Sequence, residues 1–189
     1  MTEVLTIFRL SPLLQKAKEA GEDAKTMSVL GAGVGGKIDK NDLGMKKSFS
    51  VTSAGLVAPT YNDCMIEVRP ISSSHPTLIL TTSQSFAARY PTVSFTHSTP
   101  GLVHTNIASS STSRTLRLFA PLANAAMSVV GVSPANCAEY LLHGLYNAPA
   151  GATRITNEGN DLQGKRINHS AEERDALWEH TVKETGVEA

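Results

Sequence analysis

The segment 93–105 combines a strand pattern with an abrupt stop, and it constrains the fold of this chain more than any other stretch. Apolar and ring-bearing residues alternate there with small polar ones, in the order Val93, Ser94, Phe95, Thr96, His97 and Ser98. This alternation is typical of a strand. Pro100 and Gly101 then end it, because proline removes a ladder donor and glycine permits a tight turn.

The loop that follows Gly101 lies just beyond the carboxyl end of the expected strand. In open α/β sheets, ligands bind beyond the carboxyl ends of the strands. Residues 102–105, Leu-Val-His-Thr, therefore indicate a candidate ligand-binding loop. An ordinary strand that ends in a turn explains the same pattern, and periodicity alone does not separate the two interpretations.

Length and charge restrict the class of protein. The 189 residues suffice for one domain with a hydrophobic core and are too few to argue for two. Lys and Arg number 17, as do Asp and Glu, so the net charge is zero and indicates no nucleic-acid or anionic-membrane partner. No apolar run approaches a membrane span, and the start of the chain is unlike a signal peptide. We therefore expect a cytoplasmic protein, in which Cys64 and Cys137 are free, buried thiols.

Apolar periodicity predicts helices that alternate with short, buried strands. Helices are expected at residues 5–20, 50–67, 115–130 and 134–145, and strands at residues 25–30, 93–98 and 151–156. A capping box from Ser170 to Glu173 predicts a last helix, which Gly186 stops. This order implies an α/β fold with parallel strands and right-handed crossovers.

Prolines conflict with continuity in some of these helices. We expect the first helix to begin or break near Pro12, and Pro59 to be a conflict costing about 3 kcal/mol in an ordinary helix interior. The helix over 115–130 is expected to be mostly buried and to be interrupted near Pro121.

The segment 68–84 does not continue the helical pattern of the residues before it or of those after it. It holds a serine run, two prolines and an apolar patch, and its removal would join Glu67 to Ser85 in one continuous helix. The Val-Arg at its start can be encoded by a splice-donor sequence, and the Gln at its end by a splice-acceptor ending. A retained intron and an ordinary surface insertion are both open interpretations, which sequencing of the transcript separates.

Residues 31–36, Gly-Ala-Gly-Val-Gly-Gly, satisfy the pattern G-x-G-x-x-G after an expected strand. A dinucleotide site also needs a helix that begins there, so that its amino end meets the pyrophosphate. The following residues, 37–44, show no apolar helical period, and no second strand with an acidic end follows at the expected distance. The glycines alone therefore do not indicate a phosphate site.

Other residue types that often carry chemistry have simpler interpretations here. His97, His104 and His143 do not share a ligand spacing, so no metal site is expected. We expect His97 near the edge of the sheet and His104 in a loop. Trp178 is expected to be a packing residue on the last helix, and Tyr61 to be a core or interface residue.

The strand at 25–30, the helix at 50–67 and the strand followed by Pro100 and Gly101 resemble, in this order, the carboxyl-terminal half of a short-chain dehydrogenase/reductase, closest to a divergent fungal branch. The resemblance covers most of the chain apart from 68–84. It implies a partial Rossmann-like fold of about three parallel strands flanked by helices, within one incomplete domain over 1–189.

The same resemblance implies a cofactor, a substrate class and partners. The cofactor would be NAD or NADP, and its nicotinamide end would contact Pro100, Gly101, Val103 and Thr105. The substrate would be a carbonyl or alcohol of a small molecule, such as one of secondary metabolism. The helices at 5–20 and 50–67 would form a homo- or hetero-oligomer.

The catalytic set of this family is not matched. Its serine aligns with Gly31, and its Tyr-x-x-x-Lys aligns with Phe49 and Ser53. The family tyrosine is the general acid/base, and the lysine lowers its pKa, whereas phenylalanine has no proton to give and serine has no charge. The phosphate loop and the strands that open the family fold have no counterpart here either. We therefore expect a truncated chain that is inactive alone.

Three functional interpretations stay open. The chain is an oxidoreductase by family whose activity is lost or reduced, a non-catalytic subunit that pairs with a full-length relative, or a small-molecule binding module or a mis-annotated gene fragment. The missing strands would leave residues 25–30 with an unpaired edge, which invites association or aggregation. Binding of the nicotinamide cofactor distinguishes the first interpretation from the others.

Overall fold

A parallel sheet organises the chain. The computed structural model describes residues 2–67, 85–105, 112, 114–162 and 169–187, and the segment 68–84 therefore lies outside the described residues. Within this part of the chain, the sheet has three strands, β1 (Lys25–Val29), β2 (Ser94–Ser98) and β3 (Gly151–Ile155), in the order β1-β2-β3. Both pairs are parallel, and Lys25, Ser94 and Gly151 share one register position. The expected α/β class is thereby confirmed.

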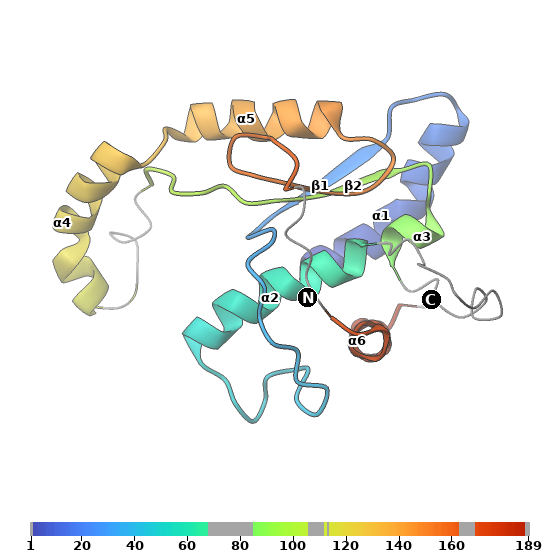
Figure 1. Ribbon diagram of the computed structural model, residues 1–189, viewed down its shortest axis with the longest axis horizontal. Coiled ribbons are helices and arrows are strands. Elements are labelled where there is room, and N and C mark those ends of the chain that lie inside the picture. Colours follow the sequence, from blue (N-terminus) through green and yellow to red (C-terminus); the bar gives the residue numbers. More distant parts are fainter. Residues whose placement is uncertain (1, 68–84, 106–111, 113, 163–168, 188–189) are drawn as a thin grey trace.

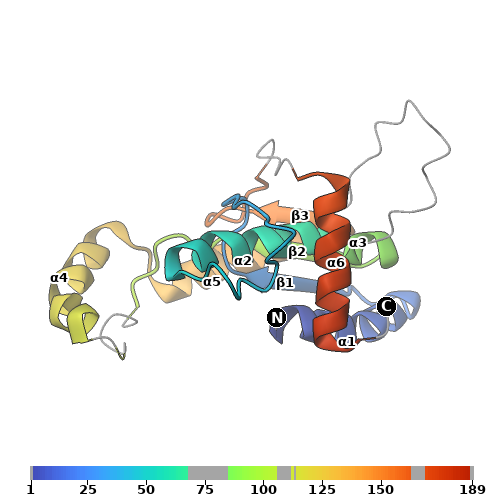
Figure 2. The same cartoon turned by 90° about the horizontal axis from the view of Figure 1, so that it is seen from below.

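Helices cover both faces of the sheet. On one face lies α5 (Pro134–Asn147), and on the other lie α1 (Thr2–Glu19), α2 (Val51–Ile66) and α6 (Ala171–Thr185) (Figures 1 and 2). The short α3 (Phe86–Arg89) leads into β2, whereas α4 (Arg114–Val130) stands away from the sheet at one end of the molecule (Figure 1). This arrangement is consistent with a partial Rossmann-like fold.

Aromatic side chains fill the core between the sheet and the helices α1, α2 and α6. The ring of Phe86 stacks on Phe95 at 5.7 Å and meets Phe8 edge-on at 4.7 Å. Trp178 lies 5.1 Å from Phe8 and is 3% exposed, which confirms its expected packing role. A smaller cluster of Cys137, Leu141 and Ile155 fixes α5 to the other face.

Short-range signals placed the helix ends correctly. The side chain of Ser170 accepts a hydrogen bond from the N–H of Glu173, and the Glu173 carboxylate accepts one from the N–H of Ser170. Ser133 caps α5 ahead of Pro134, and Gly186 ends α6 in the left-handed conformation. These ends depend on residues a few positions apart, and such signals are readable from sequence.

The expected breaks near Pro12 and Pro121 are wrong, because both residues lie inside continuous helices. Pro59 lies inside α2, as expected. Beside Pro12 and Pro59, the hydroxyls of Ser11 and Thr60 donate to the carbonyls four residues earlier, at 2.6 Å to Ile7 and at 2.9 Å to Leu56. Such bonds are common for Ser and Thr inside helices and often accompany a bend, whereas the carbonyls that lose an N–H partner to the prolines are those of Phe8 and Gly55.

Burial also differs from expectation in two elements. The helix α4, expected to be mostly buried, exposes most of its large apolar side chains, and Val129 is 83% exposed. The strand β1, expected to be buried, is mostly half-buried, and Val29 is 45% exposed. Its place at the edge of the described sheet agrees with the unpaired edge expected for residues 25–30. Periodicity shows that a face is apolar, but the partner that covers it is set by tertiary packing.

Candidate functional site

The loops that leave the carboxyl ends of the strands converge at one edge of the sheet. The N–H of Thr99, just after β2, donates to the carbonyl of Ile155 at the end of β3. The glycine-rich loop after β1 lies against the loop after β3, since a Cβ on Gly33 would lie 3.4 Å from Leu162. The structure therefore builds the carboxyl edge at which α/β folds bind their ligands.

The glycine-rich loop directs its backbone donors into the protein. The N–H of Gly31 donates to His97 Nε2 at 3.3 Å, and the N–H of Gly33 donates to Asp63 Oδ2 at 2.9 Å. The N–H of Gly36 donates to Thr60 Oγ1 at 2.5 Å. A phosphate loop presents such groups to its ligand at the start of a helix, whereas residues 37–50 here form no helix. These three donors thus hold the loop on α2 and β2.

Glycine at position 36 permits this close contact. A Cβ there would lie 2.7 Å from the carbonyl oxygen of Leu56, which belongs to the backbone of α2. Real Cβ atoms do not approach a backbone oxygen so closely, so any side chain would push the loop away from the helix. The glycine run therefore has a packing explanation in this fold.

A buried carboxylate–histidine pair lies beneath the loop. Asp63 Oδ1 is 2.6 Å from His97 Nδ1, and both side chains are completely buried. Asp63 comes from α2, and His97 comes from β2, the middle strand. The expected place of His97 near the sheet edge is therefore wrong, because alternation within a strand does not reveal the order of the strands.

The neighbours of the pair determine where its protons lie. The N–H of Gly31 points at His97 Nε2, so this nitrogen accepts and carries no proton. The proton of the neutral ring is then on Nδ1, which donates to the Asp63 carboxylate. The second oxygen of Asp63 accepts from Gly33 and lies 3.9 Å from the guanidinium of Arg154 on β3. Among the described residues, His97, Gly33 and Arg154 thus surround the buried carboxylate.

This arrangement differs from a catalytic dyad in one respect. In serine hydrolases the aspartate orients the histidine, and Nε2 then faces the nucleophile. Here Nε2 faces the backbone of Gly31, which has no side chain to activate. The pair is chemically able to hold the loop, and the geometry does not offer its histidine to a substrate.

The positions aligned with the family's catalytic set do not meet. A Cβ on Gly31 would contact Pro59 at 3.2 Å, in the middle of α2. Ser53 lies six residues before Pro59, about 9 Å away along the helix axis, and its N–H is bonded to Ser50 Oγ. Phe49 precedes the helix and is 68% exposed. No acid/base centre is assembled from Gly31, Phe49 and Ser53.

The predicted cofactor-binding residues follow β2 at the carboxyl edge. The carbonyl of Pro100 accepts from the thiol of Cys137, and Val103 forms an isolated parallel bridge with Val132. Gly101 has a φ of +65°, and a Cβ there would lie 2.8 Å from Asn157. Thr105 is exposed. A cofactor role for Pro100, Gly101, Val103 and Thr105 stays a prediction.

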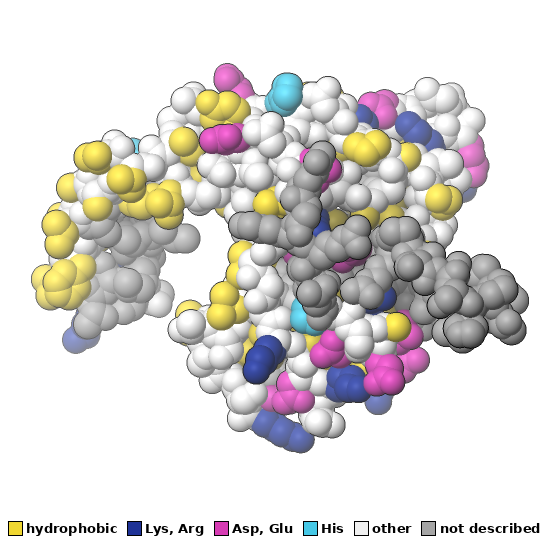
Figure 3. Space-filling model, in the orientation of Figure 1, with side chains coloured by type: hydrophobic (Ala, Val, Ile, Leu, Met, Phe, Trp, Pro, Cys, Tyr) yellow, Lys and Arg dark blue, Asp and Glu magenta, His cyan; other side chains and the backbone are white. Residues whose placement is uncertain are grey.

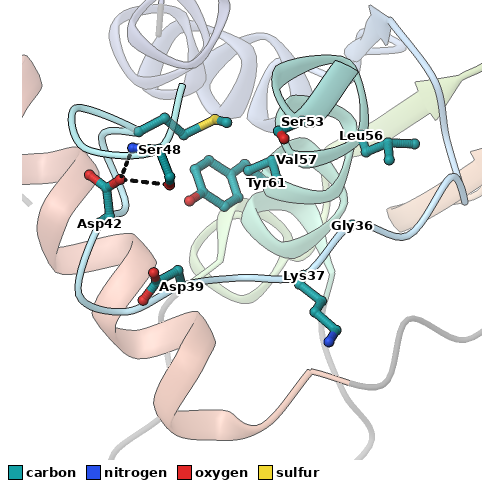
Figure 4. Close-up of a pocket in the computed structure, with 10 residues that line it drawn as sticks. Gly36, Lys37, Asp39, Asp42, Ser48, Ser53, Leu56, Val57 and Tyr61 are labelled. Atoms are coloured by element: carbon teal, nitrogen blue, oxygen red, sulfur yellow. Dashed lines mark hydrogen bonds between the residues drawn. The ribbon is translucent and has the colours of Figure 1, made fainter. Parts of the chain in front are cut away.

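A shallow pocket of about 340 Å³ lies between α2 and the loop before it (Figure 4). Figure 4 shows the ring of Tyr61 between Ser48 and Val57, with Asp39 and Asp42 on the loop side. Burial, and then the carboxylates of Asp39 and Asp42, raise the pKa of Tyr61 to about 12. Its hydroxyl donates to the carbonyl of Leu43 at 3.1 Å. Tyr61 is therefore a protonated, half-buried packing residue.

Two further groups of reactive side chains can be placed. Cys64 and Cys137 are free and buried, as expected, and burial raises the pKa of the Cys64 thiol to about 12. Among the residues that the structure describes, no three His, Cys, Asp or Glu side chains gather as a metal site. Within the same residues, no helix is long and apolar enough to cross a bilayer.

Comparisons of the chain with protein-family models, curated proteins and solved structures found no match. The resemblance to short-chain dehydrogenases therefore rests on the residues quoted above. The site itself is described by its own contacts, without a relative as a guide.

Sequence reasoning missed the residues that hold the site together, namely Asp63, Thr60 and Arg154. The sequence carried no signal for Asp63, because at 3.6 residues per turn it falls opposite the expected apolar face of this helix and is predicted to face solvent. A carboxylate on a buried face needs a partner. The sequence does not say which residue supplies that partner.

The substitution His97→Phe tests the pair. It keeps a ring on β2 but leaves Asp63 buried without its principal donor, and we expect a loss of about 3–5 kcal/mol in the free energy of unfolding. The double variant with Asp63→Asn should lose less than the sum of the single losses. Urea unfolding measures this, with His104→Phe in the exposed loop as the matched control. A loss under about 1 kcal/mol for His97→Phe would contradict the assignment.

Two glycine-to-alanine substitutions should change the free energy of unfolding in opposite directions. Gly36→Ala places a methyl group against the backbone of α2, and we expect a loss of about 1–3 kcal/mol. Gly55→Ala lies inside α2, where a Cβ meets nothing within 4 Å, and we expect a gain of up to about 1 kcal/mol. Thermal or urea unfolding compares them. Equal effects would show that the loop does not depend on glycine at position 36.

Proposed function

We propose that this chain is a non-catalytic subunit of the short-chain dehydrogenase type, which acts by associating with another chain. The observation that carries the proposal is the open edge of β1. Among the described residues, β1 pairs only with β2, and it leads into exposed apolar side chains at Val29 (45%) and Leu30 (41%). Parallel strands normally lie in sheets that are covered on both faces and are buried themselves.

An unpaired edge of this kind favours association. Its outward N–H and C=O groups offer a template to another chain, and proteins usually protect such edges with charges, prolines or covering loops. Val29 and Leu30 supply no charge at this edge. A partner that covers β1 would bury both the polar groups and the apolar side chains.

The helices expected to associate have exposed apolar residues as well. On α1, Leu10 is 46% and Leu13 is 59% exposed. On α2, the carboxyl-terminal half is buried, whereas Val51 at the amino end is 81% exposed. These helices cover the segments 5–20 and 50–67, which the family resemblance implies as an oligomer interface.

The catalytic side of the resemblance has little support in the side chains present. The donors of Gly31, Gly33 and Gly36 are bonded within the protein. Phe49 and Ser53 supply neither a proton donor nor a positive charge. We therefore propose that oxidation or reduction of a carbonyl or alcohol with NAD or NADP is the activity of relatives and not of this chain alone.

The substitution Val29→Lys tests the association. A lysine at an exposed edge position repels a neighbouring strand at small cost to the fold, so we expect the oligomer to dissociate to monomers. Sedimentation velocity over a range of concentrations measures this, with Val129→Lys on α4 as the matched control. A wild-type chain that stays a monodisperse monomer, alone and with a full-length short-chain dehydrogenase, would contradict the proposal.

Titration of the purified chain with NADH and with NADPH tests the expected absence of cofactor binding. We expect no saturable change in cofactor fluorescence, because the backbone donors that would hold the pyrophosphate are engaged. A complete short-chain dehydrogenase serves as the positive control. Saturable binding would instead favour the oxidoreductase interpretation, with Pro100 to Thr105 as the first residues to substitute.

A further inference from the structure

The helix α4 presents an apolar face to solvent along its whole length. It stands apart from the sheet (Figures 1 and 2), and apolar side chains gather on its outer surface (Figure 3). The exposed fractions are 74% for Leu118, 62% for Phe119, 71% for Leu122, 83% for Val129 and 64% for Val130. Ala120, by contrast, is 3% exposed. The bulky residues thus face away from the protein.

The apolar and polar residues lie on separate sides of this helix. At 3.6 residues per turn, the five exposed apolar residues fall within an arc of about 120°. Arg117, Asn124 and Ser128 lie on the opposite side, and Arg114 lies at its border. An arc this wide, opposite a cationic and polar side, is the pattern of a helix that lies in a membrane interface.

Charge favours an anionic partner for this face. The sequence contains no Asp or Glu between Glu67 and Glu139, whereas Arg114 and Arg117 lie in the first turn of α4. The zero net charge of the chain, which argued against an anionic membrane partner, is therefore an average over unequal parts. Around α4 the local charge is positive, and phosphate groups complement it.

We propose that α4 lies in the plane of a bilayer surface that contains anionic lipid. Its apolar face enters the boundary between headgroups and acyl chains, Arg114 at the border of that face contacts lipid phosphates, and Arg117 on the polar side adds attraction to the anionic surface. The helix has 17 residues and is about 25 Å long, and no described helix qualifies to cross a bilayer. The contact is therefore peripheral.

A second copy of the chain fits this face less well. Two α4 helices packed through their apolar faces would leave Arg114 and Arg117 on the outside of the pair, and α4 has no acidic residue with which to pair them. An anionic surface neutralises the arginines and covers the apolar arc at the same time. An acidic protein partner shares the charge but not the requirement for lipid, and the experiment separates the two.

Sedimentation with vesicles tests the proposal on the full chain. We expect binding to phosphatidylcholine vesicles that contain phosphatidylserine, weaker binding to phosphatidylcholine alone, and a decrease with added salt. The double variant Arg114→Gln, Arg117→Gln should weaken binding to the anionic vesicles about twenty-five-fold, since each arginine contributes about fivefold. The double variant Phe119→Ser, Leu122→Ser should remove binding to both.

Matched controls make the outcome decisive. Leu142→Ser removes a half-exposed leucine from α5 and should leave vesicle binding unchanged, while circular dichroism verifies the fold of each variant. Val29→Lys should change association and not lipid binding, which separates this proposal from the proposed function.

Equal binding to both vesicle types, or none, would overturn the proposal. Self-association without lipid that Phe119→Ser, Leu122→Ser abolishes would assign the face to a protein partner instead, and would also overturn it.

Discussion

The hydrogen bond between the Asp63 carboxylate and the His97 ring is the interaction on which the carboxyl edge of the sheet depends. Both side chains are completely buried, and a buried charge is tolerated only when its neighbours satisfy it. The carboxylate therefore recruits the backbone of Gly33 and the guanidinium of Arg154. One charged group thus joins α2, two neighbouring strands and the glycine-rich loop.

These buried contacts explain why the glycine-rich loop does not act as a phosphate loop. A run of glycines after a strand suggests a phosphate cradle, but here its N–H groups satisfy His97, Asp63 and Thr60. The same backbone freedom that would admit a ligand instead admits α2, which lies against Gly36. The polar chemistry of the edge is directed inward, and for this reason the proposed functions rest on surfaces.

The two surfaces of the described residues that are proposed for partners differ in physical character. The edge of β1 offers unpaired backbone groups beside Val29 and Leu30, which another strand or chain can complete. The helix α4 offers apolar side chains with a cationic flank, which suits a lipid surface. A partner of the β1 edge must supply backbone hydrogen bonds. A partner of α4 must supply an apolar layer beside negatively charged groups.

The sequence by itself determined the elements, their order and most of their ends, because caps, turns and apolar periods depend on residues that are near in the chain. The capping box at Ser170 and the stop after Ser98 are examples. Only the tertiary structure decided that His97 lies on the middle strand, that it pairs with Asp63, and that α4 exposes its apolar face. Such facts depend on contacts between distant residues, and a local pattern states that a side chain needs a partner without stating which one.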